Sequence, residues 1–497
     1  MFDLSLFWQQ FLYDEKRPML FHTGFFLFLF SAFLALYALV AYRAQWRMWL
    51  LTAFGFYFYY KASGLFLLLL LATISGDYLF SLLIAYSPKG SFWRKLALFF
   101  GILFSLSFLL YFKYADFFAA QLHALQGVAH PKVDIILPIG ISFYTFQSIS
   151  YLVDSYYERF ERPSFRAYLL YMTYFPHLVA GPIVRARDFL PQIEQPDGKN
   201  GYQYPSISLP AAHFHEAFWL ILKGFVKKAI IGDFVAQYAD IVFATPADFS
   251  GTEQLMASLA YTLQIFCDFS GYTDMAIGIS LLLGYRLCKN FDSPYAALNI
   301  TDFWRRWHIS LSFWLRDYVY IPLGGNRKGF YAQLLFLLIT MLVGGFWHGA
   351  NWKFVFWGAA HGFLLIGHKL FLRFIPASAR AYFPRPLAWL LTFCAVALLW
   401  IPFRALSMSD AWLMYKGIFS SFSWITLQNI YLNNELFLYL LLLGFAATLL
   451  PNTLKNHLFQ RFERMDFALK MLLFALCIQI FLQVQSENVQ PFIYFQF

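Results

Sequence analysis

Apolar runs long enough to cross a lipid bilayer recur from about residue 24 to about residue 485, separated only by short polar gaps. About 20 apolar residues make a membrane-spanning helix, so this pattern predicts an all-α polytopic membrane protein with about eleven or twelve crossings. Residues 1–485 are expected to form one transmembrane domain, and residues 486–497 a tail. The predicted spans include 23–42, 49–60, 65–86, 96–112, 135–157, 257–283, 334–346, 354–371, 387–402, 436–450 and 468–482.

One region departs from this pattern. Between residues 168 and 238 the sequence YMTYFPHLVAGPIVRARDF carries two prolines, a histidine and three charges where a regular span would carry none. A bilayer tolerates non-helical backbone only where protein or water covers the freed polar groups. This region therefore predicts a broken or re-entrant helix.

Composition supports the membrane class and sets the orientation. The chain is 60% hydrophobic and only 13% charged, far from a soluble protein. Its net charge of +10 comes from Lys and Arg in short loops between apolar runs. Such loops are typical of the cytoplasmic side, which argues for contact with membrane lipid and against a nucleic-acid partner. The alternation of basic loops places the tail 486–497 outside the cytoplasm.

Metal and disulfide chemistry find little support. The four cysteines lie singly in or beside apolar segments, without CxxC spacing. The sequence HFHEAF brings His213, His215 and Glu216 together, but a lone HxHE outside a span is a weak metal signal. We predict no metal site.

The stretch 299–325, NITDFWRRWHISLSFWLRDYVYIPLGG, concentrates charge between tryptophans. A continuous helix would carry an apolar face and a basic face, the first with Trp304, His308, Leu311 and Leu315 and the second with Arg305, Ser312 and Arg316. The arginines, including Arg306, fit two interpretations equally well. They either contact lipid headgroups as part of an interfacial helix or bind the phosphates of a substrate.

A second motif, GGFWHGANW, places His348 between Trp347 and Gly349 in an apolar region. An ionisable side chain there is costly unless it has a partner or a function. Burial favours the neutral imidazole, which suits a general base, although a histidine bonded to a backbone carbonyl is the simpler alternative. Hydropathy places His348 toward the outer end of its span, and a helix broken around Gly344, Gly345 and Gly349 would carry it deeper.

Two carboxylates, Asp268 and Asp274, lie within the apolar sequence FCDFSGYTDMAIGIS. They are compatible with an acid pair, an ion site, or partners that neutralise Arg305 or Arg306. We favour the last of these, a structural role.

Taken together, these motifs resemble the membrane-bound O-acyltransferase (MBOAT) family, and in particular its bacterial branch that O-acetylates alginate or peptidoglycan. The resemblance also rests on YFPHLVAGPIVR and on the C-terminal FIYFQF, so it spans most of the chain. It implies a ring of transmembrane helices with re-entrant segments around a central tunnel, in the bacterial inner membrane.

The resemblance also implies roles for individual residues. His348 falls at the family's invariant buried histidine and would be the general base. His308 falls at the second active-site position, where it would position or polarise the thioester carbonyl. In related D-alanyl transfer systems a C-terminal tyrosine carries the acyl group, which corresponds to Tyr494 here. The residues implied for donor binding and for support are Trp304, Arg305, Arg306 and Arg316, and Asp268, Trp347 and Asn351 respectively.

In this interpretation acetyl-CoA is the acyl donor and no cofactor stays bound. An extracytoplasmic SGNH-type acetyltransferase would receive the acyl group and modify a cell-surface polysaccharide. Two alternatives remain open from the residues themselves. One is a transporter or flippase without covalent chemistry, which the absence of recognisable inverted repeats argues against. The other is a non-catalytic scaffold.

Overall fold

The structure, a computed structural model, describes residues 8–15, 18–131, 133, 135–197, 201–205, 207 and 211–484. Within these residues the chain is almost entirely helical, and its two strands, β1 (Gln195–Pro196) and β2 (Tyr202–Gln203), form one short antiparallel pair. The predicted all-α class is confirmed. The chain divides into two compact units, which we call unit 1 (Met1–Phe218 and Met275–Cys288) and unit 2 (Trp219–Asp274 and Lys289–Phe497).

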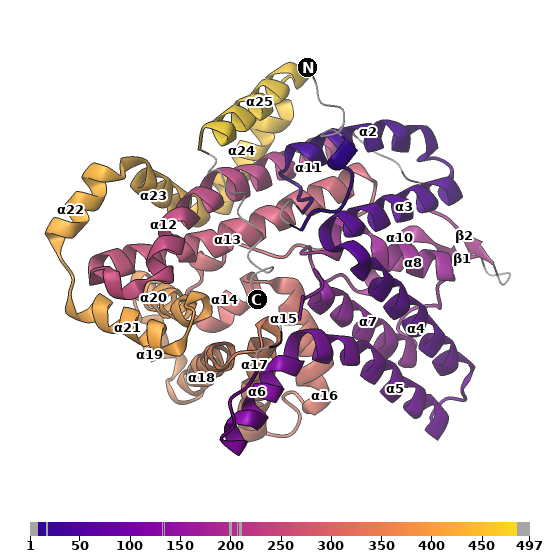
Figure 1. Ribbon diagram of the computed structural model, residues 1–497, viewed down its shortest axis with the longest axis horizontal. Helices are drawn as coiled ribbons and strands as arrows, with labels where there is room; N and C mark the ends of the chain where they lie inside the picture. Colours follow the sequence, from indigo (N-terminus) through magenta and orange to yellow (C-terminus); the bar gives the residue numbers. More distant parts are fainter. Residues whose placement is uncertain are drawn as a thin grey trace. The chain divides into compact units, whose positions relative to one another are not determined.

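Unit 1 is built from the N-terminal helices (Figure 1). They are α2 (Gly24–Val40), α3 (Ala44–Ser63), the 3₁₀ turn η1 (Gly64–Phe66), α4 (Leu67–Tyr86), α5 (Phe92–Leu109), the π-helical turn η2 (Leu110–Tyr114), α6 (Ala115–Gln126), α7 (Ile141–Tyr156), α8 (Phe165–Thr173), α9 (Phe175–Leu178) and α10 (Ala186–Ile193). Two helices contribute residues to both units, α11 (Ala211–Phe225) and α13 (Gly251–Leu282).

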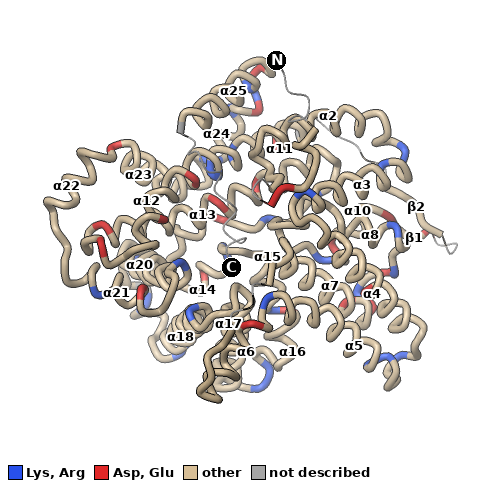
Figure 2. Tube along the Cα trace, viewed as in Figure 1, with Lys and Arg blue, Asp and Glu red and all other residues tan. Residues whose placement is uncertain are grey.

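Unit 2 contains the remaining elements, and the long apolar helices α17, α18 and α20 among them carry few charges (Figure 2). They are the π-helical turn η3 (Val226–Gly232), α12 (Asp233–Ala244), η4 (Pro246–Asp248), η5 (Pro294–Ala296), α14 (Ile300–Arg306), α15 (Ile309–Leu315), the π-helical turn η6 (Arg316–Tyr320), α16 (Ile321–Leu323), α17 (Phe330–His348), α18 (Trp352–Phe374), α19 (Ala377–Ala381), α20 (Arg385–Arg404), α21 (Met408–Ser420), α22 (Trp424–Asn433), α23 (Glu435–Leu449), α24 (Asn452–Arg464) and α25 (Phe467–Val484).

The polytopic class is confirmed by the helices themselves. Among the described residues, five helical stretches are long and apolar enough to cross a membrane, namely Ala44–Tyr86, Phe92–Gln126, Phe330–His348, Trp352–Phe374 and Arg385–Arg404. The number rises to seven if α22 with α23 and α24 with α25, bent by 101° and 117°, each form one span. Several of the other apolar runs fold as shorter helices, so the count of eleven or twelve crossings stays a prediction. The central tunnel also stays a prediction.

The region with two prolines folds as predicted, as a series of short helices rather than one span. α8 ends at Thr173, and Pro176 opens the next short helix, where a missing N–H costs nothing. His177 is fully buried in this region, and one ring nitrogen lies 2.8 Å from the backbone oxygen of Tyr171. The side chains around the break are buried as well, which is the condition for irregular backbone in a membrane protein.

In unit 2, α17 and α18 are in direct backbone contact through two glycines. A Cβ atom at Gly345 would lie 2.3 Å from the backbone oxygen of Phe354, and one at Gly358 would lie 2.4 Å from the backbone oxygen of Met341. Small residues are the usual means by which membrane helices approach this closely. The contact fixes the end of α17, where His348 lies.

We therefore predict that Gly345→Ala lowers the stability of the protein, because the added methyl group forces two helix backbones apart. A penalty of about 1–3 kcal/mol is typical of such overpacking. Gly367→Ala is the matched control, since Gly367 lies in α18 and a Cβ atom added there would meet nothing within 4 Å. The midpoint of thermal unfolding in detergent should fall for the first variant and stay or rise for the second. Equal midpoints would contradict the close-contact assignment.

Candidate active site

His348 is the last residue of α17, and the sequence after it explains why the helix stops there. Gly349 adopts an extended conformation, and a Cβ atom there would lie 2.2 Å from the ring of Phe354. Asn351 then starts α18 by accepting a hydrogen bond from the backbone N–H of Lys353 (3.0 Å). Of the three glycines suggested for a break, only Gly349 ends the helix, because α17 continues through Gly344 and Gly345 to His348.

The ring of His348 lies inside an aromatic cage. Its centroid is 4.9 Å from that of Trp347, 5.1 Å from that of Trp357 in α18 and 5.1 Å from that of Phe403 in α20. The residue is only 4% exposed. Aromatic rings thus enclose the imidazole on three sides.

His308 lies where the charged stretch breaks. The predicted continuous helix is wrong, because α14 ends at Arg306 and α15 begins at Ile309. His308 itself has φ 42° and ψ 56°, in the left-handed region that residues other than glycine rarely adopt. Such strain is retained only where the surrounding structure imposes it, and it is common at functional sites. The side chain is fully buried.

Asn290 supplies that surrounding structure. Its side-chain oxygen accepts hydrogen bonds from the backbone N–H of Ser310 (3.1 Å) and from the Ser310 hydroxyl (2.9 Å), and its backbone oxygen accepts one from the N–H of Ile309 (2.9 Å). The same side-chain oxygen lies 3.2 Å from Nδ1 of His308. Because a backbone N–H can only donate, the Asn290 atom must be the oxygen, and Nδ1 of His308 must carry the proton. In the neutral ring, Nε2 is then the atom with a lone pair.

Burial lowers the pKa of the His308 imidazole to about 3, even though a hydrogen bond to a backbone oxygen acts in the opposite direction. The ring is therefore neutral at physiological pH. A neutral ring with its proton on Nδ1 accepts hydrogen bonds at Nε2 and does not donate them there. This favours His308 as an acceptor over the role of polarising a carbonyl.

The two histidines are connected through one aromatic side chain. The ring of Trp347 is 6.2 Å from that of His308 and 4.9 Å from that of His348, measured between centroids. A Cβ atom at Gly344 would lie 3.0 Å from Leu315, so α17 also approaches the end of α15. Two motifs 40 residues apart thus meet at one place in unit 2.

The predicted donor-binding residues do not form one group of contacts. Arg305 is exposed. Arg306 pairs with Asp302 (2.9 Å), and Arg316 pairs with its neighbour Asp317 (2.6 Å). Trp304 instead turns toward α18, where its ring lies 5.7 Å from that of Trp357 and 5.1 Å from that of His361.

The expectation that Asp268 or Asp274 neutralises an arginine of α14 is wrong. Lys228 of η3 lies 2.5 Å from Asp268 and 2.7 Å from Asp233. Asp274 pairs with Lys227 (2.8 Å) and Lys223 (3.2 Å). Both carboxylates nevertheless form ion pairs within the protein, with lysines in place of the expected arginines.

Sequence reasoning missed a third histidine in the same cluster. His361 is fully buried one helical turn from Trp357, and their ring centroids are 4.6 Å apart. Among the described residues neither of its ring nitrogens has a hydrogen-bond partner. The signal was present in GGFWHGANWKFVFWGAAHG, because the argument from a costly buried imidazole applies to both of its histidines. Asn290 was also missed, and its sequence context gives no comparable signal.

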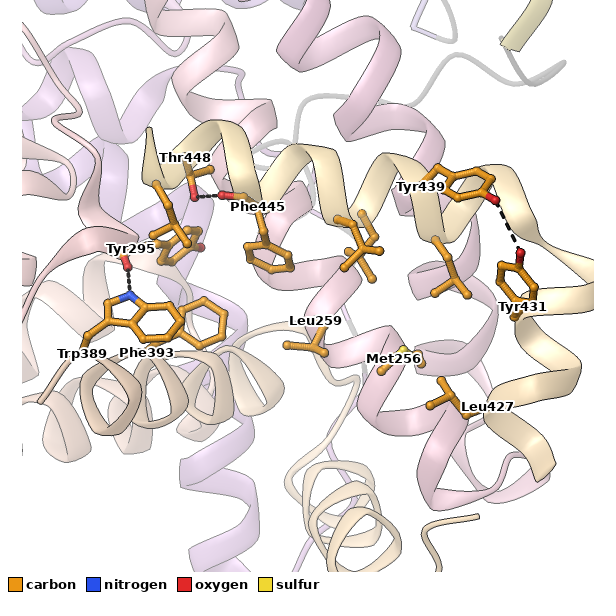
Figure 3. A pocket seen from close by; sticks show the side chains of 14 residues that line it. Met256, Leu259, Tyr295, Trp389, Phe393, Leu427, Tyr431, Tyr439, Phe445 and Thr448 are labelled. Atoms are coloured by element: carbon orange, nitrogen blue, oxygen red, sulfur yellow. Dashed lines mark hydrogen bonds between the residues drawn. The ribbon is translucent and has the colours of Figure 1, made fainter. Parts of the chain in front are cut away.

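A separate apolar cavity of about 440 Å³ lies among α13, α20, α22 and α23 (Figure 3). Its polar groups are already bonded to protein atoms, as Trp389 Nε1 donates to the backbone oxygen of Tyr295 (2.8 Å) and Thr448 Oγ1 to that of Phe445 (2.7 Å). Neither His308 nor His348 lines it.

Two further predictions concern Tyr494 and His213. Tyr494 lies outside the described residues. His213, part of the weak metal signal, is hydrogen-bonded to the guanidinium of Arg286. Within the part of the chain that the structure describes, no group of three or more His, Cys, Asp or Glu residues is arranged to hold a metal ion.

Asn290→Ala is expected to lower kcat about tenfold or more with little change in KM, because His308 loses the contact that fixes its ring and tautomer. Asn290→Asp retains the acceptor and should restore much of the rate. Its carboxylate also raises the pKa of His308, so the rate should fall as pH drops through that raised value, where the wild-type rate does not. Equal losses in both variants across pH 5–8 would show that Asn290 only supports folding.

Comparison with known proteins identifies the family of this chain. The profile of MBOAT, the membrane-bound O-acyltransferase family, matches residues 52–389, which include both histidines and parts of both units. The chain belongs to this family, and it is a multi-pass membrane O-acyltransferase.

Its relatives include enzymes that act on several polymers. The chain is 40% identical to the "probable alginate O-acetylase AlgI" of Azotobacter vinelandii over 82% of this chain and 79% of that one. It is 36% identical to the peptidoglycan O-acetyltransferase of Helicobacter pylori over 80% of each. The teichoic acid D-alanyltransferase of Bacillus subtilis is 29% identical over 49% of this chain and 61% of its own length.

Proposed function

We propose that the protein takes an acetyl group from cytoplasmic acetyl-CoA and passes it across the bacterial inner membrane for the O-acetylation of a cell-surface polysaccharide. The observation that carries this proposal is the buried pair His308 and His348, joined by Trp347, in a chain of this family. The relatives named for alginate and peptidoglycan support an acetyl group and a polysaccharide acceptor.

His348 is the general base in this reaction. It takes the proton from the acceptor hydroxyl, and the hydroxyl oxygen attacks the thioester carbonyl. The C–S bond then breaks, and the CoA thiolate receives the proton from the imidazolium. His308, neutral and protonated on Nδ1, orients a reactant by accepting a hydrogen bond at Nε2. The aromatic cage excludes the water that would hydrolyse the thioester.

The first acceptor in this scheme is the phenol of Tyr494. A phenolate leaves more readily than an alkoxide, so a phenolic ester passes its acyl group on easily. The likeness to teichoic acid D-alanyltransferases supports a shared acyl-transfer design, and the charge pattern of the loops supports a tail outside the cytoplasm. An extracytoplasmic SGNH-type enzyme then moves the group to the polymer.

One experiment tests donor and acceptor together. Purified protein is incubated with acetyl-CoA that carries a labelled acetyl group, and its peptides are separated and counted. Label on the peptide that contains residues 486–497, with release of CoA, is the expected result. Unmodified protein and unconsumed acetyl-CoA, with movement of an intact solute into liposomes instead, would contradict the proposal.

A further inference from the structure

Five basic side chains of unit 2 come together at the loop that precedes α14. We call Lys223, Lys227, Lys289, Arg306 and Lys455 the basic cluster. They come from α11, η3, the loop before η5, α14 and α24, so elements far apart in sequence supply them. In Figure 2 α24 carries basic segments and α13 acidic ones.

Two members of the basic cluster contact the short loop 289–293, and a third, Lys289, belongs to it. Lys455 Nζ lies 2.5 Å from the hydroxyl of Ser293, and Lys289 Nζ lies 2.7 Å from a carboxylate oxygen of Asp292. Arg306 Nη1 donates to the backbone oxygen of Asp292 (3.4 Å). The loop 289–293 is therefore the centre of the cluster.

The remaining members are close enough for their charges to act on one another. Lys227 Nζ lies 5.1 Å from the ring centroid of Phe266, which is 5.9 Å from that of Phe291 in the loop. Lys223 contacts the same carboxylate as Lys227, that of Asp274. Positive charges gathered around one loop repel one another and lower the stability of the fold. Such a cost is typical of functional sites.

The cluster is only partly neutralised by the protein. Lys223 and Lys227 share Asp274, whereas Lys289 pairs with Asp292 and Arg306 with Asp302. The hydrogen bond of Lys455 goes to a hydroxyl instead of a carboxylate. Among the residues that the structure describes, five cations thus share three carboxylates, and the arrangement suits an additional anion.

The side chains of the basic cluster differ in their exposure to solvent. The side chain of Lys289 is 65% exposed, whereas that of Lys227 is 22% exposed. An anion from solution would therefore meet partly desolvated cations, which bind phosphate oxygens more strongly than fully exposed ones.

The chain connects the cluster directly to His308. Lys289 is followed by Asn290, which holds the His308 ring, and Arg306 lies two residues before His308. The backbone N–H of Asp292 donates to the oxygen of Arg306 (2.9 Å), and that of Ile309 to the oxygen of Asn290 (2.9 Å). One short hydrogen-bonded segment therefore joins the cluster to His308.

We propose that the basic cluster binds the phosphate groups of the thioester donor and so places its acyl end toward His308. This rests on the proposed function and assigns the phosphates to residues other than Arg305 and Arg316. The cluster would recognise phosphate groups. In a membrane, the headgroups of anionic lipids are a second source of phosphate.

The test compares two donors that differ in their phosphates. Acetyl-CoA carries them, and S-acetylpantetheine does not. Lys289→Gln and Lys455→Gln should each raise KM for acetyl-CoA about tenfold, the loss expected for one charged contact, and leave KM for S-acetylpantetheine unchanged. Lys416→Gln, an exposed lysine of α21 outside the cluster, is the matched control. An equal rise for both donors, or no rise, would overturn the proposal.

Binding of adenosine 3′,5′-bisphosphate, the nucleotide part of CoA, gives a readout that does not need turnover. Wild-type protein should bind it in competition with acetyl-CoA, and the double variant Lys289→Gln/Lys455→Gln should not. Binding of the nucleotide by the double variant would overturn the assignment. So would a loss of nucleotide binding that is seen only when the nanodiscs contain anionic lipid, because the cluster would then be a lipid site. If wild type binds the nucleotide yet acetylates nothing, the cluster stands and the proposed function fails.

Discussion

His348→Ala should lower the rate of acetyl transfer by at least about a hundredfold, the range expected when a general base is removed. The His348 ring is 4% exposed and enclosed by the rings of Trp347, Trp357 and Phe403, so no solvent base of comparable basicity can take its place. The measurement is CoA release from acetyl-CoA by purified protein, together with the label recovered on the C-terminal peptide.

Two companion variants separate chemistry from folding. His348→Gln fills more of the cage than Ala and lacks the basic ring nitrogen, so it should be equally inactive and more stable. His457→Ala, which removes an exposed histidine from α24, should retain the wild-type rate. Undiminished turnover by a well-folded His348→Ala protein would remove the general-base assignment.

Hydropathy located the helices because the bilayer imposes their length and apolar character. The predicted spans 334–346, 354–371 and 387–402 lie within α17, α18 and α20. Two prolines likewise revealed that 168–193 is not one helix, since proline removes a donor from the helix interior. The local sequence was sufficient to predict a helix or its end wherever nearby residues, such as a long apolar run or a proline, determine it.

The backbone at His308 had no local cause. Periodicity placed His308 on the apolar face of a continuous helix, and the residues from Ile300 to Leu315 are compatible with one. The break depends on Asn290, 18 residues earlier, whose two oxygens hold the start of α15. A contact supplied by another segment overrides the helical tendency, and periodicity within one window does not contain that information.

The predicted partners of two carboxylates are wrong for a similar reason. The sequence suggested Arg305 or Arg306 as the partner of Asp268 and Asp274, whereas their partners are Lys228, Lys227 and Lys223. Sign alone leaves every opposite charge a candidate, and only the packing of η3 against α13 selects among them. The same packing brings the basic cluster together, so the sequence named Arg306 as a donor-binding candidate without indicating Lys289 or Lys455.

Tyr494→Phe should abolish the acetyl label on the C-terminal peptide and with it the acetylation of the external acceptor. The substitution removes one oxygen atom and leaves the aromatic ring, so an anchoring role at the membrane surface would be unaffected. Tyr439→Phe is the control, because the Tyr439 hydroxyl lies on a helix edge 3.5 Å from that of Tyr431 and remote in sequence from the tail. Acetyl-CoA binding should remain at the wild-type level in both.

The comparison with His348→Ala orders the two steps. If Tyr494 receives the acetyl group, the Phe variant still has its base and its donor site, and CoA is released only as fast as water replaces the phenol. His348→Ala loses transfer to either acceptor. Acetylated polymer formed at the normal rate by Tyr494→Phe would show that the acetyl group reaches the partner without a tyrosyl ester, while the role of His348 would still stand.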